Sequence, residues 1–192
     1  MSLKELSPVP FSMAGIFLGT LLPMALVVAI FMDGSWTFNE NSLSDLGVSD
    51  NPTVANIFNS VCMFGGVLMA IVGLGKVNLG KDLDRTSGIC LVIGAVFLFL
   101  VGVFPKDQLA IHICVAMVFF SMTTVAVLTS MVSDYRNKRR LSATISSILL
   151  VISLAAIPGF SYKGLEVIGF VCMYIWFLVQ GFSLTFSNHY EQ

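Results

Sequence analysis

The chain has 192 residues, of which 56% are hydrophobic and only 11% are charged. Water-soluble domains carry about 25% charged residues, so the composition excludes an ordinary soluble fold and indicates a protein that lies in a lipid bilayer. The net charge of −1 produces no strong field, and we expect no nucleic-acid partner.

Six apolar segments follow one another along the chain, and each is close to the 17–25 residues, roughly, that a helix needs to cross a bilayer. They cover residues 10–32, 52–75, 86–104, 109–133, 141–158 and 164–186. Their apolar residues are continuous rather than alternating, which favours helices over a barrel. The sequence therefore predicts an all-α, polytopic membrane protein. In this prediction residues 1–192 form a single domain, a six-transmembrane-helix bundle in the cell membrane.

The first segment contains small residues at a spacing that suits close helix packing. Gly15 and Gly19 form a GxxxG pair, which lets two helix backbones approach each other. The pair predicts close packing inside the bundle, and it also leaves homo-oligomerisation open. Pro23 lies in the same segment, where it removes a backbone donor and predicts a kink.

The connection at 33–51 is the longest between two apolar segments, and it contains a pattern typical of a helix start. Ser42 and Asp45 have the spacing of a capping box, which predicts a short helix at about 42–46. We expect Gly47 to close that turn in a left-handed conformation. Asn51 before Pro52 predicts the capped start of the second long helix.

Lys and Arg are distributed unequally between the connections, and this asymmetry predicts the orientation, because cytoplasmic connections collect basic residues. Eight of them lie at one end of the predicted bundle: Lys4, Lys76, Lys81, Arg85, Arg136, Lys138, Arg139 and Arg140. The other end has Lys106 and Lys163. We therefore expect both termini in the cytoplasm and the connections at 33–51, 105–108 and 159–163 on the outer face.

The basic residues at 135–140 form the densest cluster of positive charge in the chain. Such a cluster beside a transmembrane helix fixes the topology and attracts anionic lipid headgroups. The predicted partners are therefore the lipid bilayer and, at this inner connection, anionic lipid headgroups.

Polar residues at the outer ends of the predicted helices are candidates for a ligand-binding site. They are Ser44, Asp45, Asn59, Lys106, His112 and Glu166. His112 is the one histidine inside an apolar segment, and imidazole gains or loses a proton near neutral pH. Ionisable groups at membrane depth are often functional, and Glu166 could pair with His112 or Lys106. The alternative roles are structural, as a hydrogen bond between helices or as compensation of a helix dipole.

The sequence gives no sign of a metal or a cofactor. The four cysteines lie in apolar stretches without the paired spacing of a zinc site. Asp45, His112 and Glu166 could hold a metal only if the fold brought all three together. The chain has no nucleotide-binding loop and no paired histidines for haem, so we predict no cofactor.

Four short motifs follow one another in the order found in one family. They are Asn41-Ser42-Leu43-Ser44-Asp45-Leu46-Gly47, Ala55-Asn56-Ile57-Phe58-Asn59, Gly102-Val103-Phe104-Pro105-Lys106-Asp107 with His112 behind it, and Gly164-Leu165-Glu166 followed by Trp176. On these motifs the chain resembles the domain of unknown function 998 family, which comprises small prokaryotic and archaeal membrane proteins. The resemblance implies six membrane helices without an established activity. It also implies that the signature positions gather near one membrane face: Ser44, Asp45, Gly47, Asn59, Pro105, His112 and Glu166.

We expect a protein that binds or transports a small ligand, a proton or a lipid headgroup through a polar site on the outer face. A membrane-embedded enzyme that modifies lipids is one alternative, because Asp45, His112 and Glu166 offer acid and base groups. We favour binding over catalysis because the chain has no nucleophile motif and no metalloprotease motif. A structural or accessory subunit is the other alternative, in which the same residues only hold the outer connections on the bundle.

Overall fold

The computed structural model describes residues 7–186, and all of its long elements are helices. The long helices are α1 (Val9–Asp33), α2 (Pro52–Leu79), α3 (Asp82–Val103), α4 (Leu109–Arg136), α5 (Arg140–Ala156) and α6 (Tyr162–Phe186). Two short 3₁₀ helices, η2 (Leu43–Val48) and η3 (Lys106–Gln108), lie in the connections. Each predicted apolar segment coincides with one long helix, so the prediction of an all-α protein is confirmed.

The connection between α2 and α3 is shorter than the sequence predicts. Residues 76–85 were expected to join the two helices, but α2 continues to Leu79 and α3 begins at Asp82. Acidic residues in the first turn of α3 favour the earlier start, because negative charge stabilises a helix N-terminus. Lys76 is consequently helical, and with only 4% of its surface exposed it is not the solvated connection residue that its charge suggested.

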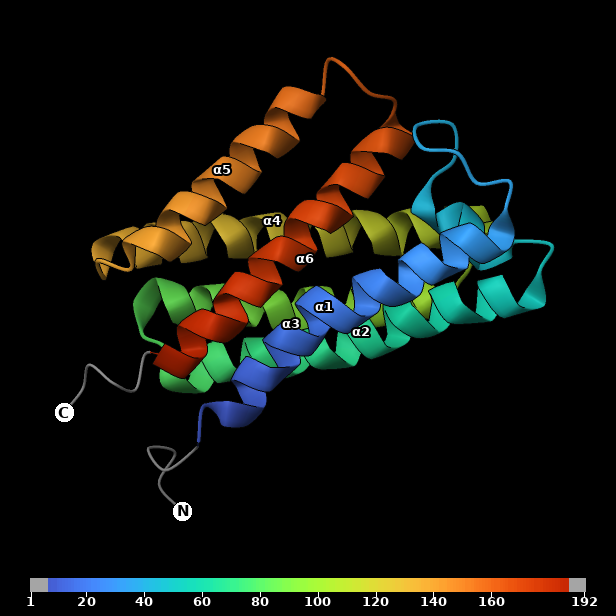
Figure 1. Ribbon diagram of the computed structural model, residues 1–192. Helices are drawn as coiled ribbons and strands as arrows, with labels where there is room; N and C mark the ends of the chain where they lie inside the picture. The colour runs from blue at the N-terminus through green and yellow to red at the C-terminus, as the bar shows by residue number, and fades with distance from the viewer. Residues whose placement is uncertain (1–6, 187–192) are drawn as a thin grey trace.

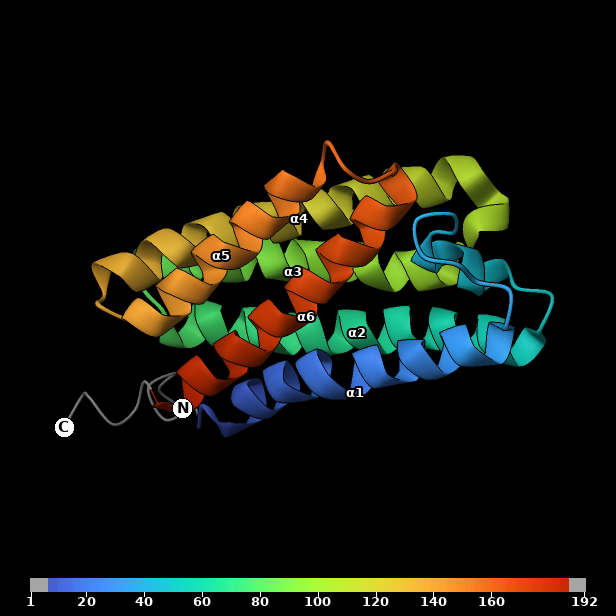
Figure 2. The same cartoon turned by 45° about the horizontal axis from the view of Figure 1, so that its top comes forward.

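Helices α1 to α4 lie side by side, and the α5–α6 hairpin crosses one face of this layer (Figures 1 and 2). α6 packs on α1 at one end of the bundle and diverges from it toward the other. The short η2 fills the resulting wedge, where it contacts α1, α2 and α6. The core lies between the layer and the hairpin, and its largest buried side chains are Phe58, Phe119, Trp176 and Phe177.

The GxxxG pair of α1 packs against α6 within the chain. A Cβ on Gly15 would stand 2.8 Å from the Cα of Gly181, and a Cβ on Gly19 would stand 2.7 Å from the Tyr174 carbonyl oxygen. Glycine is required at both positions because the facing atoms belong to the backbone and cannot move aside. Pro23 lies inside α1, which is a single helix from Val9 to Asp33.

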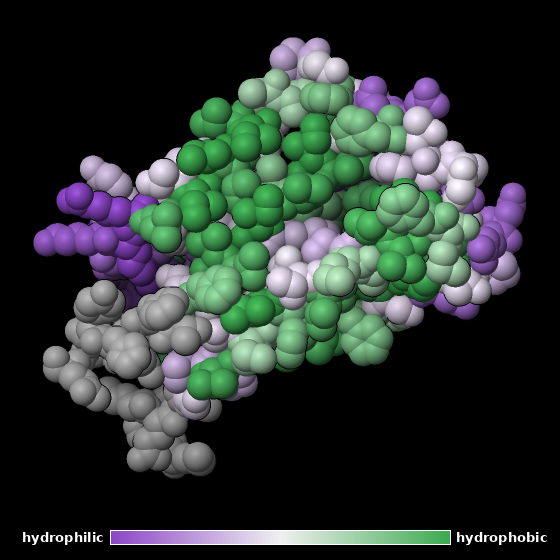
Figure 3. All heavy atoms as spheres, viewed as in Figure 1, coloured by the Kyte–Doolittle hydropathy of each residue, from purple (hydrophilic) through white to green (hydrophobic). Residues whose placement is uncertain are grey.

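The two ends of the bundle carry different connections. At the termini end, α1 begins, α6 ends, and residues 80–81 and 137–139 join neighbouring helices (Figure 1). At the loop end lie η2, η3 and the α5–α6 connection at 157–161. Figure 3 shows apolar side chains over the middle of the molecule and hydrophilic side chains at both ends, as expected for a protein that spans a bilayer.

Within residues 7–186, five helices are long and apolar enough to cross a membrane: α1, α2, α3, α4 together with η3, and α6. α5 has 17 residues, which make about 25 Å of helix against about 30 Å for a bilayer core. The protein is thus an all-α, polytopic membrane protein, and a sixth crossing by α5 stays a prediction. Lys4, which entered the orientation argument, lies outside the described residues.

Candidate functional site

The capping box predicted for Ser42 and Asp45 is present. The Asp45 carboxylate accepts the backbone N–H of Ser42 at 2.7 Å. The helix that starts there, η2, covers Leu43–Val48 rather than residues 42–46. Leu43 and Leu46 are buried because η2 fills the wedge between α1 and α6, and this burial fixes η2 over the interior of the bundle.

Gly47 has a different role from the one that the sequence predicts. Gly34 is the one glycine of the described chain with a positive φ, so the expected left-handed conformation at Gly47 is wrong. A Cβ on Gly47 would instead stand 2.8 Å from Asn59 Oδ1 and 2.9 Å from the ring of Phe58. Glycine is required because η2 packs directly on α2, and no side chain fits between them.

Lys106 lies on η3 and contacts the start of η2. Its ammonium forms an ion pair with Asp45 and donates a hydrogen bond to Ser42 Oγ at 2.7 Å. Burial alone would raise the pKa of Asp45, but hydrogen bonds from Lys106 and Ser42 outweigh that effect and hold the pKa below its ordinary value. Asp45 is therefore ionised at neutral pH, and Lys106 compensates its charge.

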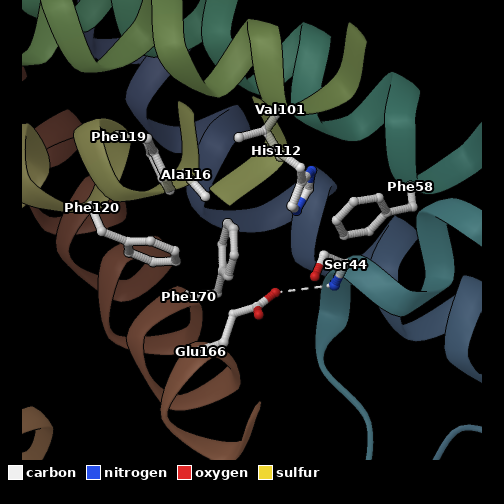
Figure 4. A pocket seen from close by; sticks show the side chains of 9 residues that line it. All are labelled: Ser44, Phe58, Val101, His112, Ala116, Phe119, Phe120, Glu166 and Phe170. Carbon is white, nitrogen blue, oxygen red and sulfur yellow. Dashed lines mark hydrogen bonds between the residues drawn. The ribbon is translucent and has the colours of Figure 1, made fainter. Parts of the chain in front are cut away.

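Beneath η2 lies a small cavity with His112 on one side and Glu166 on the other (Figure 4). Its volume is about 30 Å³, and one water needs about 10–15 Å³ of such space. The polar wall consists of Ser44, His112 and Glu166, and the apolar wall of Phe58, Val101, Ala116, Phe119, Phe120 and Phe170. A cavity of this size with polar groups on one wall can hold about two waters or one hydroxyl group.

Each ionisable group of the polar wall is anchored by a hydrogen bond to the backbone. Glu166 Oε1 accepts the backbone N–H of Ser44 at 3.0 Å. His112 Nδ1 donates to the carbonyl oxygen of Phe104 at 2.8 Å, since a carbonyl can only accept. This bond leaves Nε2 for the cavity, toward which the imidazole ring points in Figure 4. A carboxylate and an imidazole around one cavity can pass a proton between them through water.

The other three predicted site residues lie outside the cavity wall. Asp45 and Lys106 form the ion pair that holds η2 in place, and Asn59 donates its side-chain amide to the Gly47 carbonyl at 3.1 Å. Asn59 Oδ1 is buried without a hydrogen bond in the described part of the chain. Within residues 7–186 no group of three or more side chains is arranged to hold a metal ion.

The turn before η2 is tied to the start of α6. Asn39 has a φ of 68°, and its Oδ1 accepts the backbone N–H of Ser161 at 2.8 Å. The Lys163 ammonium donates to the carbonyl oxygen of Glu40 at 2.6 Å. These bonds hold the roof of the cavity and the helix that carries Glu166 in one fixed arrangement.

A second polar cluster, which sequence reasoning missed, lies inside the termini end. This termini-end cluster consists of Lys76, Asp84, Asp134, Arg139 and Gln180. The Lys76 ammonium lies 3.3 Å from Asp84 and donates to Gln180 Oε1 at 2.7 Å. Arg139 pairs with Asp84 and with Asp134, in the second case at 2.7 Å. Two cations meet two carboxylates here, so their charges cancel.

The termini-end cluster was missed because its basic members were counted as solvated topology residues. Asp84 and Asp134 are only 6% and 1% exposed, and a buried carboxylate needs a cation beside it. The available signal was the presence of both acidic residues, near helix ends, among the basic residues of the same end. Pattern alone does not say which of several basic residues turns inward.

The basic residues at 135–140 do not all face the surface, because one of them takes part in the termini-end cluster. Arg139 turns inward to the two carboxylates, whereas Arg136, Lys138 and Arg140 are exposed at the surface. The run therefore presents less charge at the surface than the sequence suggests.

Comparison with known proteins identifies a family but no activity. The family model described as "Protein of unknown function (DUF998)" matches residues 16–183. No curated protein and no solved structure matches the chain. The matched region contains the cavity beneath η2 and the termini-end cluster. The chain therefore belongs to the DUF998 family, as its four motifs indicate.

Proposed function

We propose that this membrane protein binds a small polar group in the cavity beneath η2 and exchanges a proton with it. The observation that carries the proposal is the convergence of Ser44, His112 and Glu166, from three separate segments, on one cavity. The sequence left a small ligand, a proton and a lipid headgroup open. A volume of about 30 Å³ favours protonated water or a single hydroxyl over a phosphate-bearing headgroup.

The polar wall can both donate and accept. A neutral His112 with its proton on Nδ1 accepts at Nε2, and a carboxylate at Glu166 accepts at the oxygen that Ser44 does not engage. A bound hydroxyl could donate to one group and accept from the other once that group carries a proton. Proton exchange between Glu166 and His112 therefore changes which bonds the ligand makes.

Aromatic side chains support binding at one face rather than transport through the bundle. Glu166 and Gln180 lie at opposite ends of the buried face of α6, and the side chains between them on that face include Phe170, Tyr174 and Phe177. The rings of Phe119 and Phe120 on α4 lie 5.8 and 5.4 Å from that of Phe170. Packed rings leave little room for the water that a proton would need to cross.

We also propose that the chain crosses the cell membrane six times, with the loop end outside and the termini in the cytoplasm. α5 supports this topology because it leads from the termini end toward the loop end (Figure 1). The exposed basic residues support it as well: Lys81, Arg85, Arg136, Lys138 and Arg140 all lie at the termini end. Arg136, Lys138 and Arg140 would contact anionic headgroups there.

Infrared spectroscopy of the full chain in lipid vesicles tests the proton exchange. We expect a carboxyl band that changes as the pH of the vesicle suspension is varied. The band should vanish in Glu166→Gln and shift in His112→Gln, because the cavity then lacks one proton partner. Asp107→Asn is the matched control, since Asp107 is an exposed carboxylate at the same end. A band that persists in Glu166→Gln or ignores His112→Gln would refute the proposal.

A lipid-modifying enzyme is the second candidate, because a serine hydroxyl and an imidazole share this cavity with a carboxylate. Against catalysis, Ser44 Oγ is hydrogen-bonded to Ser42 Oγ at 3.0 Å and not to His112. A serine-reactive fluorophosphonate separates the two functions. Labelling of Ser44 that is lost in His112→Gln would establish the enzyme, and an unlabelled Ser44 would favour binding.

A further inference from the structure

The wall of the cavity between α4 and α6 is built from side chains alone. α4 packs along α3, and α6 packs along α1, but the backbones of α4 and α6 have almost no close contact with each other. α5 does not cover this gap, because it tilts away from α4 toward the loop end (Figure 1). A few side chains therefore separate the cavity from the surrounding lipid.

We name this gap the α4–α6 seam and define it by Ala116, Phe120, Gly169 and Phe170. Ala116, Phe120 and Gly169 are half-buried, and so is Glu166 behind them. A Cβ on Gly169 would stand 3.7 Å from the ring of Phe120 and meet nothing closer, so glycine leaves room in the seam that a larger side chain would fill.

The outer surface beside the seam faces lipid. On α4, Ile113 and Met117 flank the seam residues and are 47% and 64% exposed. In a membrane-spanning protein such apolar side chains contact acyl chains. The seam thus lies between an apolar surface and a cavity with polar groups on its wall, and this arrangement suits a molecule with an apolar tail and a small polar head.

We propose that the ligand is a neutral lipid with a hydroxyl head, of the diacylglycerol or long-chain alcohol class, that enters from the bilayer through the α4–α6 seam. The inference rests on the proposed function, because the head occupies the cavity formed by Ser44, His112 and Glu166. The tail lies on the outer side of the seam, against the half-buried Phe120 and the exposed Met117.

The cavity selects the head by size and by charge. A hydroxyl group fits a volume of about 30 Å³ and can donate to Glu166 while it accepts from a protonated His112. A phosphate exceeds this volume and brings negative charge next to a carboxylate, where like charges repel. The site therefore prefers a hydroxyl-headed lipid over a phospholipid with the same acyl chains.

Photocrosslinking tests the inference on the full chain in phosphatidylcholine vesicles. A diacylglycerol with a diazirine in its acyl chain is compared with a phosphatidylcholine that carries the same chain, and the crosslinked peptides are mapped by mass spectrometry. We expect the diacylglycerol to label α4 and α6 at the seam. Glu166→Gln and His112→Gln should lower that labelling about tenfold to a hundredfold, as the loss of one hydrogen bond to a charged group would.

The Gly169→Leu variant tests lipid entry through the seam independently of proton exchange in the cavity. It should abolish labelling by the diacylglycerol and leave the carboxyl band of Glu166 responsive to pH. Gly159→Leu is the matched control, because Gly159 is exposed and its Cβ would stand 3.8 Å from the nearest atom.

Two results would overturn the lipid inference and leave the proposed function intact. One is equal seam labelling by the phosphatidylcholine probe. The other is full diacylglycerol labelling in Gly169→Leu, provided that the carboxyl band of Glu166 still responds to pH. Loss of that band's dependence on Glu166 would instead overturn the proposed function itself.

Discussion

The termini-end cluster and the cavity beneath η2 both contain ionisable side chains inside the bundle. Those of the termini-end cluster form ion pairs, whereas Glu166 and His112 at the cavity are hydrogen-bonded to the backbone. At the termini end, Lys76 and Arg139 are matched by Asp84 and Asp134, and Gln180 joins the two halves. At the loop end, Glu166 and His112 each make one hydrogen bond to the backbone and line a cavity.

From this difference we infer a structural role for the termini-end cluster and keep the cavity beneath η2 as the candidate site. Buried charges that pair completely hold helices together, and removing one member leaves an uncompensated charge in a dry interior. Polar atoms that face a cavity are available to a ligand. The ionisable residues of the termini-end cluster, which sequence reasoning missed, are therefore assigned the structural role. His112 and Glu166, which the sequence indicated as candidates, line the candidate site.

The largest effect on stability is expected when one of the two cations of the termini-end cluster, Lys76, is removed. Lys76→Met leaves Asp84 with one partner and should lower the free energy of unfolding by about 3–5 kcal/mol. Denaturant unfolding in detergent micelles measures the change. Lys81→Met, an exposed cation at the same end, should stay within about 0.5 kcal/mol of the unchanged chain.

A double variant sharpens this test. Adding Asp84→Leu to Lys76→Met removes the uncompensated carboxylate and leaves Arg139 paired with Asp134. Much of the lost stability should return, because an apolar pair can replace a buried ion pair at little cost. If Lys76→Met alone leaves stability unchanged, the cluster does not hold the helices as we infer.

A smaller effect is expected where η2 meets α2. Gly47→Ala places a Cβ 2.8 Å from Asn59 Oδ1 and 2.9 Å from the ring of Phe58, which is itself buried. Overpacking of this kind costs about 1–3 kcal/mol, and thermal unfolding measures it. Gly159→Ala meets no atom closer than 3.8 Å and should be neutral. Equal melting of the two variants would show that η2 does not pack on α2 as described.

The smallest effect concerns the ion pair that holds η2. The pKa of Asp45 in the folded protein lies below its ordinary value of 3.8, so the carboxylate stabilises η2 fully above about pH 4. This contribution is lost as the pH falls through the folded pKa. Trp36 reports the loss by fluorescence, because its indole N–H donates to the Ser42 carbonyl at 2.8 Å. Asp45→Asn should remove the acid transition, and an identical transition in that variant would assign it to another group.

Sequence reasoning found the fold class, the approximate positions of the helices, the capping box, and three polar residues that line the cavity: Ser44, His112 and Glu166. These features depend on local composition and spacing, which a single chain displays directly. It failed for Gly47, Lys76 and Arg139. The role of each is set by a residue on another helix: Asn59 on α2 for Gly47, Gln180 on α6 for Lys76, and Asp84 on α3 for Arg139.

By itself, the sequence determined that this protein lies in a membrane as a set of helices, because continuous apolar runs leave a backbone in lipid no other way to satisfy its hydrogen bonds. Only the tertiary structure decided which polar residues meet. The tilt of α6 across the layer opens the wedge that η2 fills, brings Glu166 to His112, and aligns Gln180 with Lys76. These contacts depend on the packing angles between helices, which the sequence of one segment alone does not determine.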